Sequence, residues 1–275
     1  MRKLILALFI ILSCSSLANS GGVISFPGGG VPNAACAAPA WYNQTGITVT
    51  SGAGTVVFAW EGNVSGSNSS AYNNSCTEIV GTLTGGDIGT YQSKTALRID
   101  AADEYITFTQ TARQYFSDVD DQTICVEAYI SAVPDNKAVS LFLGSTNTGN
   151  DDSFVLNKAL SANLESRWYS QTGTDQAMVG GTTPYAAWKA FAGSFDETGN
   201  LLGVGIADQT PWLNGYDAGG RDIVAFTDGS DRIYIGNNST KTPNTSDGIP
   251  GVDVYISKVA IISGYLADCS ELTGW

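Results

Sequence analysis

The residues best suited to bind a ligand lie between positions 208 and 222, where the chain shows neither strand alternation nor helical periodicity. Trp212 lies in this stretch. An indole ring exposed on such a loop can stack on the apolar C–H face of a sugar, and nearby amides and carboxylates can bind the sugar hydroxyls. The alternative is that Trp212 closes the end of a hydrophobic core. Because neighbouring strand residues point to opposite faces, either Trp168 or the adjacent Tyr169 faces outward or into a groove. The carbohydrate-binding candidates are therefore Trp212, Asn214, Tyr216, Asp217 and Trp168.

Acidic residues gather in several turn-like stretches, among them 118–121 (DVDD) and 247–253 (DGIPGVD). Ca²⁺ takes oxygen ligands from Asp, Asn and backbone carbonyls, so each stretch could supply a metal site. The alternative is a solvated turn, in which Asp and Asn side chains bind their own backbone. The candidate Ca²⁺ ligands are Asp247, Asp253, Asp118 and Asp120.

The chain contains no histidine. This excludes Ser-His-Asp and Cys-His catalysis and argues against a zinc enzyme. Hydrolysis of a glycosidic bond by carboxylates needs two acidic side chains that flank the bond. Glu127 and Glu165 each stand on a predicted strand with no second acidic residue at the alternate positions. We therefore predict a non-catalytic protein, with a polysaccharide-cleaving enzyme as the weakest alternative.

Residues 1–20 have the pattern of a secretory signal, with a basic start, an apolar run over 4–12 and small residues before a cleavage site at Ser20. The apolar run is too short to span a membrane. Residues 11–14 (ILSC) resemble a bacterial lipobox, so a lipid anchor at Cys14 is the alternative. The 26 acidic side chains outnumber the 13 basic ones, which argues against nucleic-acid binding. The sequence thus predicts a protein that is secreted or held at the cell surface.

Four cysteines remain after removal of the signal, and an even number in an exported chain favours disulfides. Sequence alone leaves three connectivities open. Our hypothesis is that Cys36–Cys76 fastens the N-terminal segment, and that Cys125–Cys269 ties an early core strand to the end of the last strand.

The elements that must position these side chains are strands. Residues alternate on both sides of the turn-forming segment 196–200 (DETGN), which predicts an antiparallel hairpin over 188–207 with Trp188 in the core. Other short alternating stretches are separated by turn residues. One is 122–132, in which Ile124, Val126, Ala128 and Ile130 fall on one face and Cys125, Glu127 and Tyr129 on the other. Only 265–272 could form one or two helical turns. We expect an all-β fold, a two-sheet antiparallel sandwich or jelly roll over 47–275, preceded by a Gly/Pro-rich leader over 21–46.

Six segments in order resemble the laminin-G-like branch of the concanavalin A-like lectin and glucanase superfamily. They read ALRID…DEYI from position 96, TICVEAYI from 123, WKAFAGSFD from 188, RIYIG from 232, YISKVAI from 255 and YLAD from 265. The chain departs from the family pattern at two pairs. Lys189 and Ala190 replace histidines, and Ser257 and Lys258 replace an Asp-Glu pair.

The resemblance implies a concanavalin A-like jelly roll whose metal and ligand sites lie on loops at one rim. On that ground Asp247 and Asp253 rank first among the candidate Ca²⁺ ligands. The function it implies is a secreted or cell-surface carbohydrate-binding module, lectin-like and non-catalytic, with Ca²⁺ as its candidate cofactor and a glycan or glycoconjugate as its partner. The alternative is a structural or adhesive envelope component, or a virion surface protein, in which the sandwich is a rigid interaction domain.

Overall fold

The computed structural model describes residues 45–49, 52–63, 68–73, 77–109, 121–132, 139–145, 153–158, 163–169, 175–196, 201–210, 212–215, 232–238, 252–270, 272 and 275. Secondary structure over this part of the chain consists of β-strands, with no helix. The strands are β1 (Thr45–Val49), β2 (Gly52–Glu61), β3 (Asn68–Asn73), β4 (Glu78–Thr84), β5 (Asp87–Tyr91), β6 (Lys94–Ile99), β7 (Asp103–Phe108), β8 (Gln122–Ile130), β9 (Val139–Ser145), β10 (Ser153–Lys158), β11 (Asn163–Tyr169), β12 (Asp175–Thr182), β13 (Trp188–Asp196), β14 (Leu201–Ile206), β15 (Trp212–Gly215), β16 (Arg232–Asn238) and β17 (Val254–Ser263).

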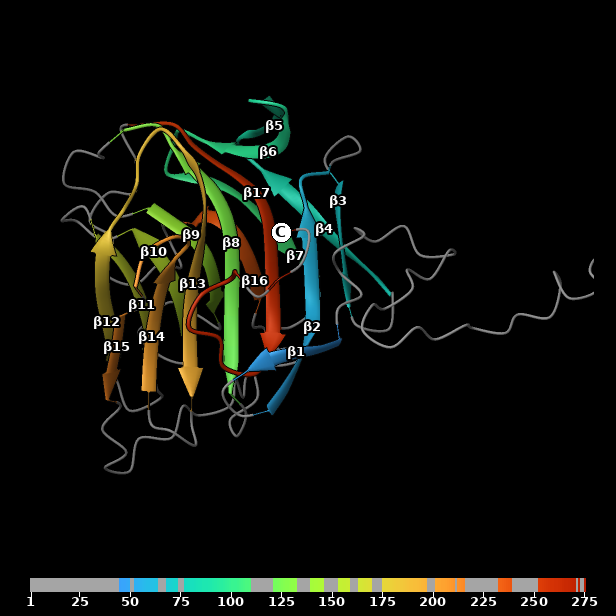
Figure 1. The fold of residues 1–275 in the computed structure, drawn as a ribbon. Helices are drawn as coiled ribbons and strands as arrows, with labels where there is room; N and C mark the ends of the chain where they lie inside the picture. The colour runs from blue at the N-terminus through green and yellow to red at the C-terminus, as the bar shows by residue number, and fades with distance from the viewer. Residues whose placement is uncertain are drawn as a thin grey trace, which may run out of the picture. The chain divides into compact units, whose positions relative to one another are not determined.

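The strands form one continuous antiparallel sheet that curls into a half-barrel (Figure 1). One row of paired strands runs β2-β17-β8-β13-β14-β15, and a second runs β4-β7-β16-β9-β10-β11-β12. Strand β3 pairs with both β2 and β4 and so joins the two rows. The all-β antiparallel prediction is confirmed, but two separate jelly-roll sheets are not, because β3 links the two rows.

The predicted hairpin is present as β13 and β14, which pair from Phe191 opposite Ile206 to Asp196 opposite Leu201. Alternation on β8 is also confirmed. Ile124, Val126, Ala128 and Ile130 are buried on one face, which we call the core face, where they join the main hydrophobic cluster. Cys125 on the opposite, outer face belongs to a second cluster. Full burial of each such aliphatic side chain stabilises the fold by roughly 1.5–3 kcal/mol.

The segment after β17 covers one end of the outer face. It consists of bends and turns over 264–270, so the helical turns predicted for 265–272 are absent from its described residues. Gly264 N donates to Asp121 O at 2.6 Å, and Leu266 N donates to Thr123 Oγ1 at 2.8 Å. A disulfide joins Cys125 of β8 to Cys269, which confirms that predicted pair. These contacts hold the described part of the chain's C-terminal segment, residues 264–270, 272 and 275, against the sheet.

A glycine on β14 allows this close approach. A Cβ atom at Gly205 would lie 2.3 Å from the Ala267 carbonyl oxygen, well inside van der Waals contact. The C-terminal segment therefore lies directly on the β14 backbone.

The β5–β6 hairpin covers the other end of the outer face (Figure 1). Its two-residue turn, Gln92-Ser93, has positive φ angles at both positions, as a type I′ turn requires. Tyr91, just before the turn, stacks on Tyr255 of β17 with ring centroids 3.9 Å apart and planes 5° apart. The outer face is thus covered at both ends and is open between the two covers.

Candidate functional site

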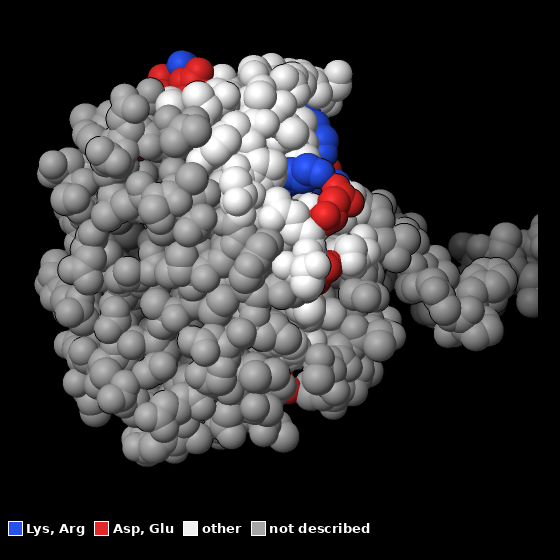
Figure 2. Space-filling view, turned by 60° about the vertical axis from the view of Figure 1, so that its left-hand side comes forward, with Lys and Arg blue, Asp and Glu red and all other residues white. Residues whose placement is uncertain are grey.

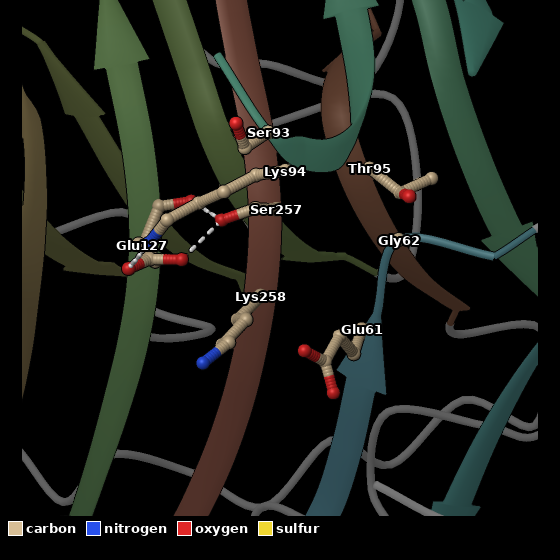
Figure 3. A pocket seen from close by; sticks show the side chains of 8 residues that line it. All are labelled: Glu61, Gly62, Ser93, Lys94, Thr95, Glu127, Ser257 and Lys258. Carbon is tan, nitrogen blue, oxygen red and sulfur yellow. Dashed lines mark hydrogen bonds and ion pairs between the residues drawn. The ribbon is translucent and has the colours of Figure 1, made fainter. Parts of the chain in front are cut away.

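Glu127 lies on the outer face of β8, between the two covers, and is 6% exposed. A carboxylate buried to this extent needs hydrogen-bonding or charged partners to offset the loss of water. Lys94 Nζ, from the β5–β6 hairpin, donates to Oε1, and Ser257 Oγ, from β17, donates to Oε2. The three side chains come from different parts of the sequence and form one network (Figure 3).

A hollow of about 380 Å³ lies on one side of Glu127. Figure 3 shows how Glu127, Lys258 and Glu61 lie around it, with the hairpin residues Ser93, Lys94 and Thr95. It is lined by Glu127, by Glu61 and Gly62 at the end of β2, by Ser257 and Lys258 of β17, and by the hairpin residues Ser93, Lys94 and Thr95. Its lining is strongly polar, with two acidic and two basic side chains.

A β-bulge on β17 builds part of this lining. Ile256 pairs with Ala128, and the next paired residue, Lys258, lies opposite Glu127, so Ser257 is an extra residue. Because a bulge interrupts strict alternation, two consecutive residues can face the same side. Ser257 and Lys258 both line the hollow, whereas the flanking Ile256 lies in the core.

A second hollow, of about 240 Å³, lies on the other side of Glu127. Trp188, Lys189 and Ala190 of β13 form one wall, Ala207 and Asp208 follow β14, and Cys269, Ser270, Leu272 and Trp275 belong to the C-terminal segment. Lys189 Nζ pairs with Asp208 Oδ2 at 2.5 Å. The two hollows share Glu127, and we refer to them together as the outer-face groove.

Aromatic side chains pack above Glu127, beneath the β5–β6 hairpin. The Tyr91 ring lies 5.0 Å from Tyr129 and 6.4 Å from Trp188, and Tyr129 lies 5.8 Å from Trp188. A hydrogen bond with Tyr129, together with burial, raises the pKa of Tyr91 to about 12. Lys94 Nζ lies 5.2 Å from the centroid of the Trp188 ring, a cation–π distance that ties the aromatic cluster to the Glu127 network.

Several charged side chains on the described surface lie in groups of mixed sign. In Figure 2 the basic side chains lie against acidic ones, in one group at the top of the view and another at its right-hand edge. One such group centres on Arg98, whose Nη2 lies 2.7 Å from Asp100 and 3.0 Å from Asp253. The hydrogen bond to Asp253 raises the pKa of Arg98, whereas burial raises the pKa of Asp100.

Asp253 was a predicted Ca²⁺ ligand. In the structure its carboxylate accepts a hydrogen bond from Arg98, and the Tyr255 hydroxyl lies 3.3 Å from Oδ2. Among the described residues there is no group of three or more acidic or cysteine side chains that could hold a metal ion.

The structure places few of the other predicted ligand residues. Trp212 and Asn214 lie on strand β15, which pairs with β14, so the irregular loop predicted there is wrong for 212–215. Trp168 lies on β11. The side chains of these three residues are outside the described part of the structure, and so are the following residues in full: Tyr216, Asp217, Asp247, Asp118, Asp120, Cys36, Cys76 and Cys14.

Two residues of the groove, Trp188 and Glu127, were not predicted as part of a binding site. Trp188 was predicted in the core, but it is half-buried on the outer face and lines the second hollow. The signal was available, because Trp188 alternates in phase with Ala190 and Ala192, and both belong to the outer cluster. Glu127 was noted only as a lone acid on a strand.

No helix in the described part of the chain is long and apolar enough to cross a membrane. No protein-family model and no curated protein sequence matches the chain.

Solved structures with a similar fold include binding domains of larger proteins, several of them botulinum neurotoxins. They include the binding domain of Paraclostridial Mosquitocidal Protein 1 (13% identity, 77% of this chain and 49% of that chain, TM-score 0.57). The botulinum neurotoxin serotype G binding domain is also similar (10%, 77% and 48%, TM-score 0.56). A third is the serotype D ligand binding domain in complex with N-acetylneuraminic acid (8%, 77% and 48%, TM-score 0.55). The chain thus spans about half the length of these structures, and the likeness concerns the fold.

The prediction of a laminin-G-like domain is wrong. No family model supports it, and the similar structures named above are the binding domains of Paraclostridial Mosquitocidal Protein 1 and of botulinum neurotoxins. The segments that suggested it are short strand patterns, and many antiparallel β-proteins satisfy such patterns.

Proposed function

We propose that this chain is a non-catalytic carbohydrate-binding module, secreted or held at the cell surface, and that the outer-face groove binds its glycan. The observation that carries the proposal is the network at the centre of the groove. A sugar hydroxyl both donates and accepts hydrogen bonds, and the groove offers it the acceptors Glu127 and Ser257 Oγ and the donor Lys94 within one site. A few polar groups converging on a cavity are typical of small-molecule sites.

The state of Glu127 favours binding over hydrolysis. A glycosidase needs one carboxyl group to act as acid and a second to act as nucleophile or base. Both oxygens of Glu127 already accept hydrogen bonds, one of them from an ammonium group. A carboxylate held in this way is suited to orient a hydroxyl group.

The fold is compatible with this role. The structures it resembles are described as binding domains, and one of them was solved with N-acetylneuraminic acid bound. Their identity to this chain is low, so they support a binding role without naming this chain's ligand.

A glycan array tests the proposal. We expect the wild-type chain to bind a defined set of glycans, and Glu127→Gln to weaken that binding at least tenfold, about 1.4 kcal/mol, because the amide is uncharged. Glu78→Gln is the matched control, since Glu78 is exposed on β4, outside the groove. Equal melting temperatures of the two variants would show that folding is intact.

The same experiment also tests the predicted Ca²⁺ dependence, the enzyme alternative and the predicted role of Trp212. Loss of binding in EDTA would support the predicted Ca²⁺ dependence, and glycan cleavage abolished by Glu127→Gln would support the enzyme alternative instead. Trp212→Ala tests the predicted site on β15 against the groove. Absence of binding to every glycan on the array would contradict the proposal. It would favour the alternative of a structural or adhesive envelope component, or of a virion surface protein.

A further inference from the structure

The floor of the outer-face groove is a continuous row of register-paired residues across adjacent strands. Glu61 of β2 pairs with Lys258 of β17, Lys258 pairs with Glu127 of β8, and Glu127 pairs with Ala190 of β13. Ala207, just beyond β14, continues the row, because its N–H donates to the Ala190 carbonyl at 3.0 Å. Paired residues on neighbouring strands point to the same face, so all five share the outer face.

The length of this row indicates a chain-like ligand. Neighbouring strands lie about 4.8 Å apart, so the four steps from Glu61 to Ala207 span roughly 19 Å. A single sugar ring is far shorter than this row. Both hollows lie along it, and Glu127 lines each of them.

The chemistry of the row changes from one end to the other. The Glu61 end is lined by charged and hydroxyl side chains. The Ala207 end has a floor of small residues, with the half-buried indole rings of Trp188 and Trp275 and the apolar Leu272 in its walls. A polar end suits hydroxyl groups, and an apolar, aromatic end suits the C–H face of a sugar ring.

The charges of the groove are matched. Lys94 pairs with Glu127, Lys189 pairs with Asp208, and the two remaining charges of the first hollow, Glu61 and Lys258, are opposite in sign and paired across strands. Among the described residues of the lining, no excess charge therefore selects an anionic or cationic ligand. Glu127 retains acceptor capacity, because a carboxylate offers about four lone-pair sites and the network uses one on each oxygen.

We propose that the outer-face groove binds an uncharged oligosaccharide lying across the strands, with Glu127 under its centre and one ring against the aromatic end. This inference rests on the proposed function and specifies its ligand class. Trp275 contributes to the second hollow only, so its removal affects the part of the ligand that extends beyond Glu127.

The test is calorimetric titration of the full chain with neutral homo-oligosaccharides of glucose, galactose and mannose, from monosaccharide to hexasaccharide, and with sialyllactose as a charged probe. We expect the affinity for at least one neutral series to rise about tenfold or more between the monosaccharide and the longer members, corresponding to about 1.4 kcal/mol. Trp275→Ala should remove most of that gain with ligand length, whereas Trp275→Phe should retain it.

Two results would overturn the inference while leaving the proposed function in place. One is an affinity independent of length in every neutral series, and the other is a preference for sialyllactose over all neutral ligands. Unaltered length dependence in Trp275→Ala would exclude the aromatic end from the site. Absence of binding to these probes and to the whole glycan array would instead refute the proposed function itself.

Discussion

Removal of the Cys125–Cys269 disulfide should destabilise the protein substantially and loosen one wall of the groove. The bond closes a loop of 144 residues, and the loop-entropy relation for a disulfide then assigns it about 5 kcal/mol. For a domain of this size each kcal/mol lowers the melting temperature by roughly 2–4 °C. We therefore expect the double variant Cys125→Ala/Cys269→Ala to melt roughly 10–20 °C below the wild type.

Thermal unfolding of both single variants and the double variant measures this effect. Either single change breaks the bond, so each should lower the melting temperature nearly as much as both together. Strongly non-additive effects of this kind identify residues that act as a pair. Additive effects, or a fall of less than about 2 °C in the double variant, would refute the reasoning.

The same variants connect stability to the groove. Cys269 anchors the segment that carries Leu272 and Trp275, two walls of the second hollow. At a temperature where the double variant remains folded, we expect it to lose affinity for long neutral oligosaccharides more than for short ones. An equal loss at all lengths would show that the disulfide does not act through this wall.

Two further predictions concern the covers of the outer face. Gly205→Ala should lower the free energy of unfolding in urea by about 1–3 kcal/mol, because its Cβ would lie 2.3 Å from the Ala267 carbonyl oxygen. The control Gly89→Ala should be near neutral, because the nearest atom to its Cβ is 3.9 Å away, and equal effects of the two changes would contradict the close approach at Gly205. Tyr91, with a pKa raised to about 12 in the fold against about 10 when unfolded, keeps its proton longer in the folded state, so stability should fall as the pH rises from about 10 to 12. Urea midpoints across this range should fall less steeply in Tyr91→Phe, and an unchanged slope would rule out this contribution.

Local features of the sequence were predictable because they depend on neighbouring residues. Alternation on β8 correctly separated the core-facing Ile124 and Val126 from the outward-facing Cys125 and Glu127. The β13–β14 hairpin followed from alternation on both sides of a turn. The Cys125–Cys269 pair was also predicted correctly, from its expected position at the end of the last strand.

Alternation could not say which face of a strand lies in the core when both faces are covered. Trp188 was placed in the core, yet the β5–β6 hairpin packs above it on the outer face, beside Tyr91 and Tyr129. The contact depends on a hairpin almost a hundred residues earlier in the chain. The family assignment failed for a related reason, since short strand patterns report local pairing and leave the long-range connections open.

The sequence by itself determined an all-β protein without histidine chemistry, because composition and period-two alternation are properties of the chain alone. Only the tertiary structure decided where a ligand could bind. Glu61, Lys258, Glu127 and Ala190 are scattered over the sequence, and strand register aligns them in one row. The bulge that places the side chains of Ser257 and Lys258 on the same face is likewise a result of pairing between distant strands. The groove is therefore a consequence of register, which long-range packing sets.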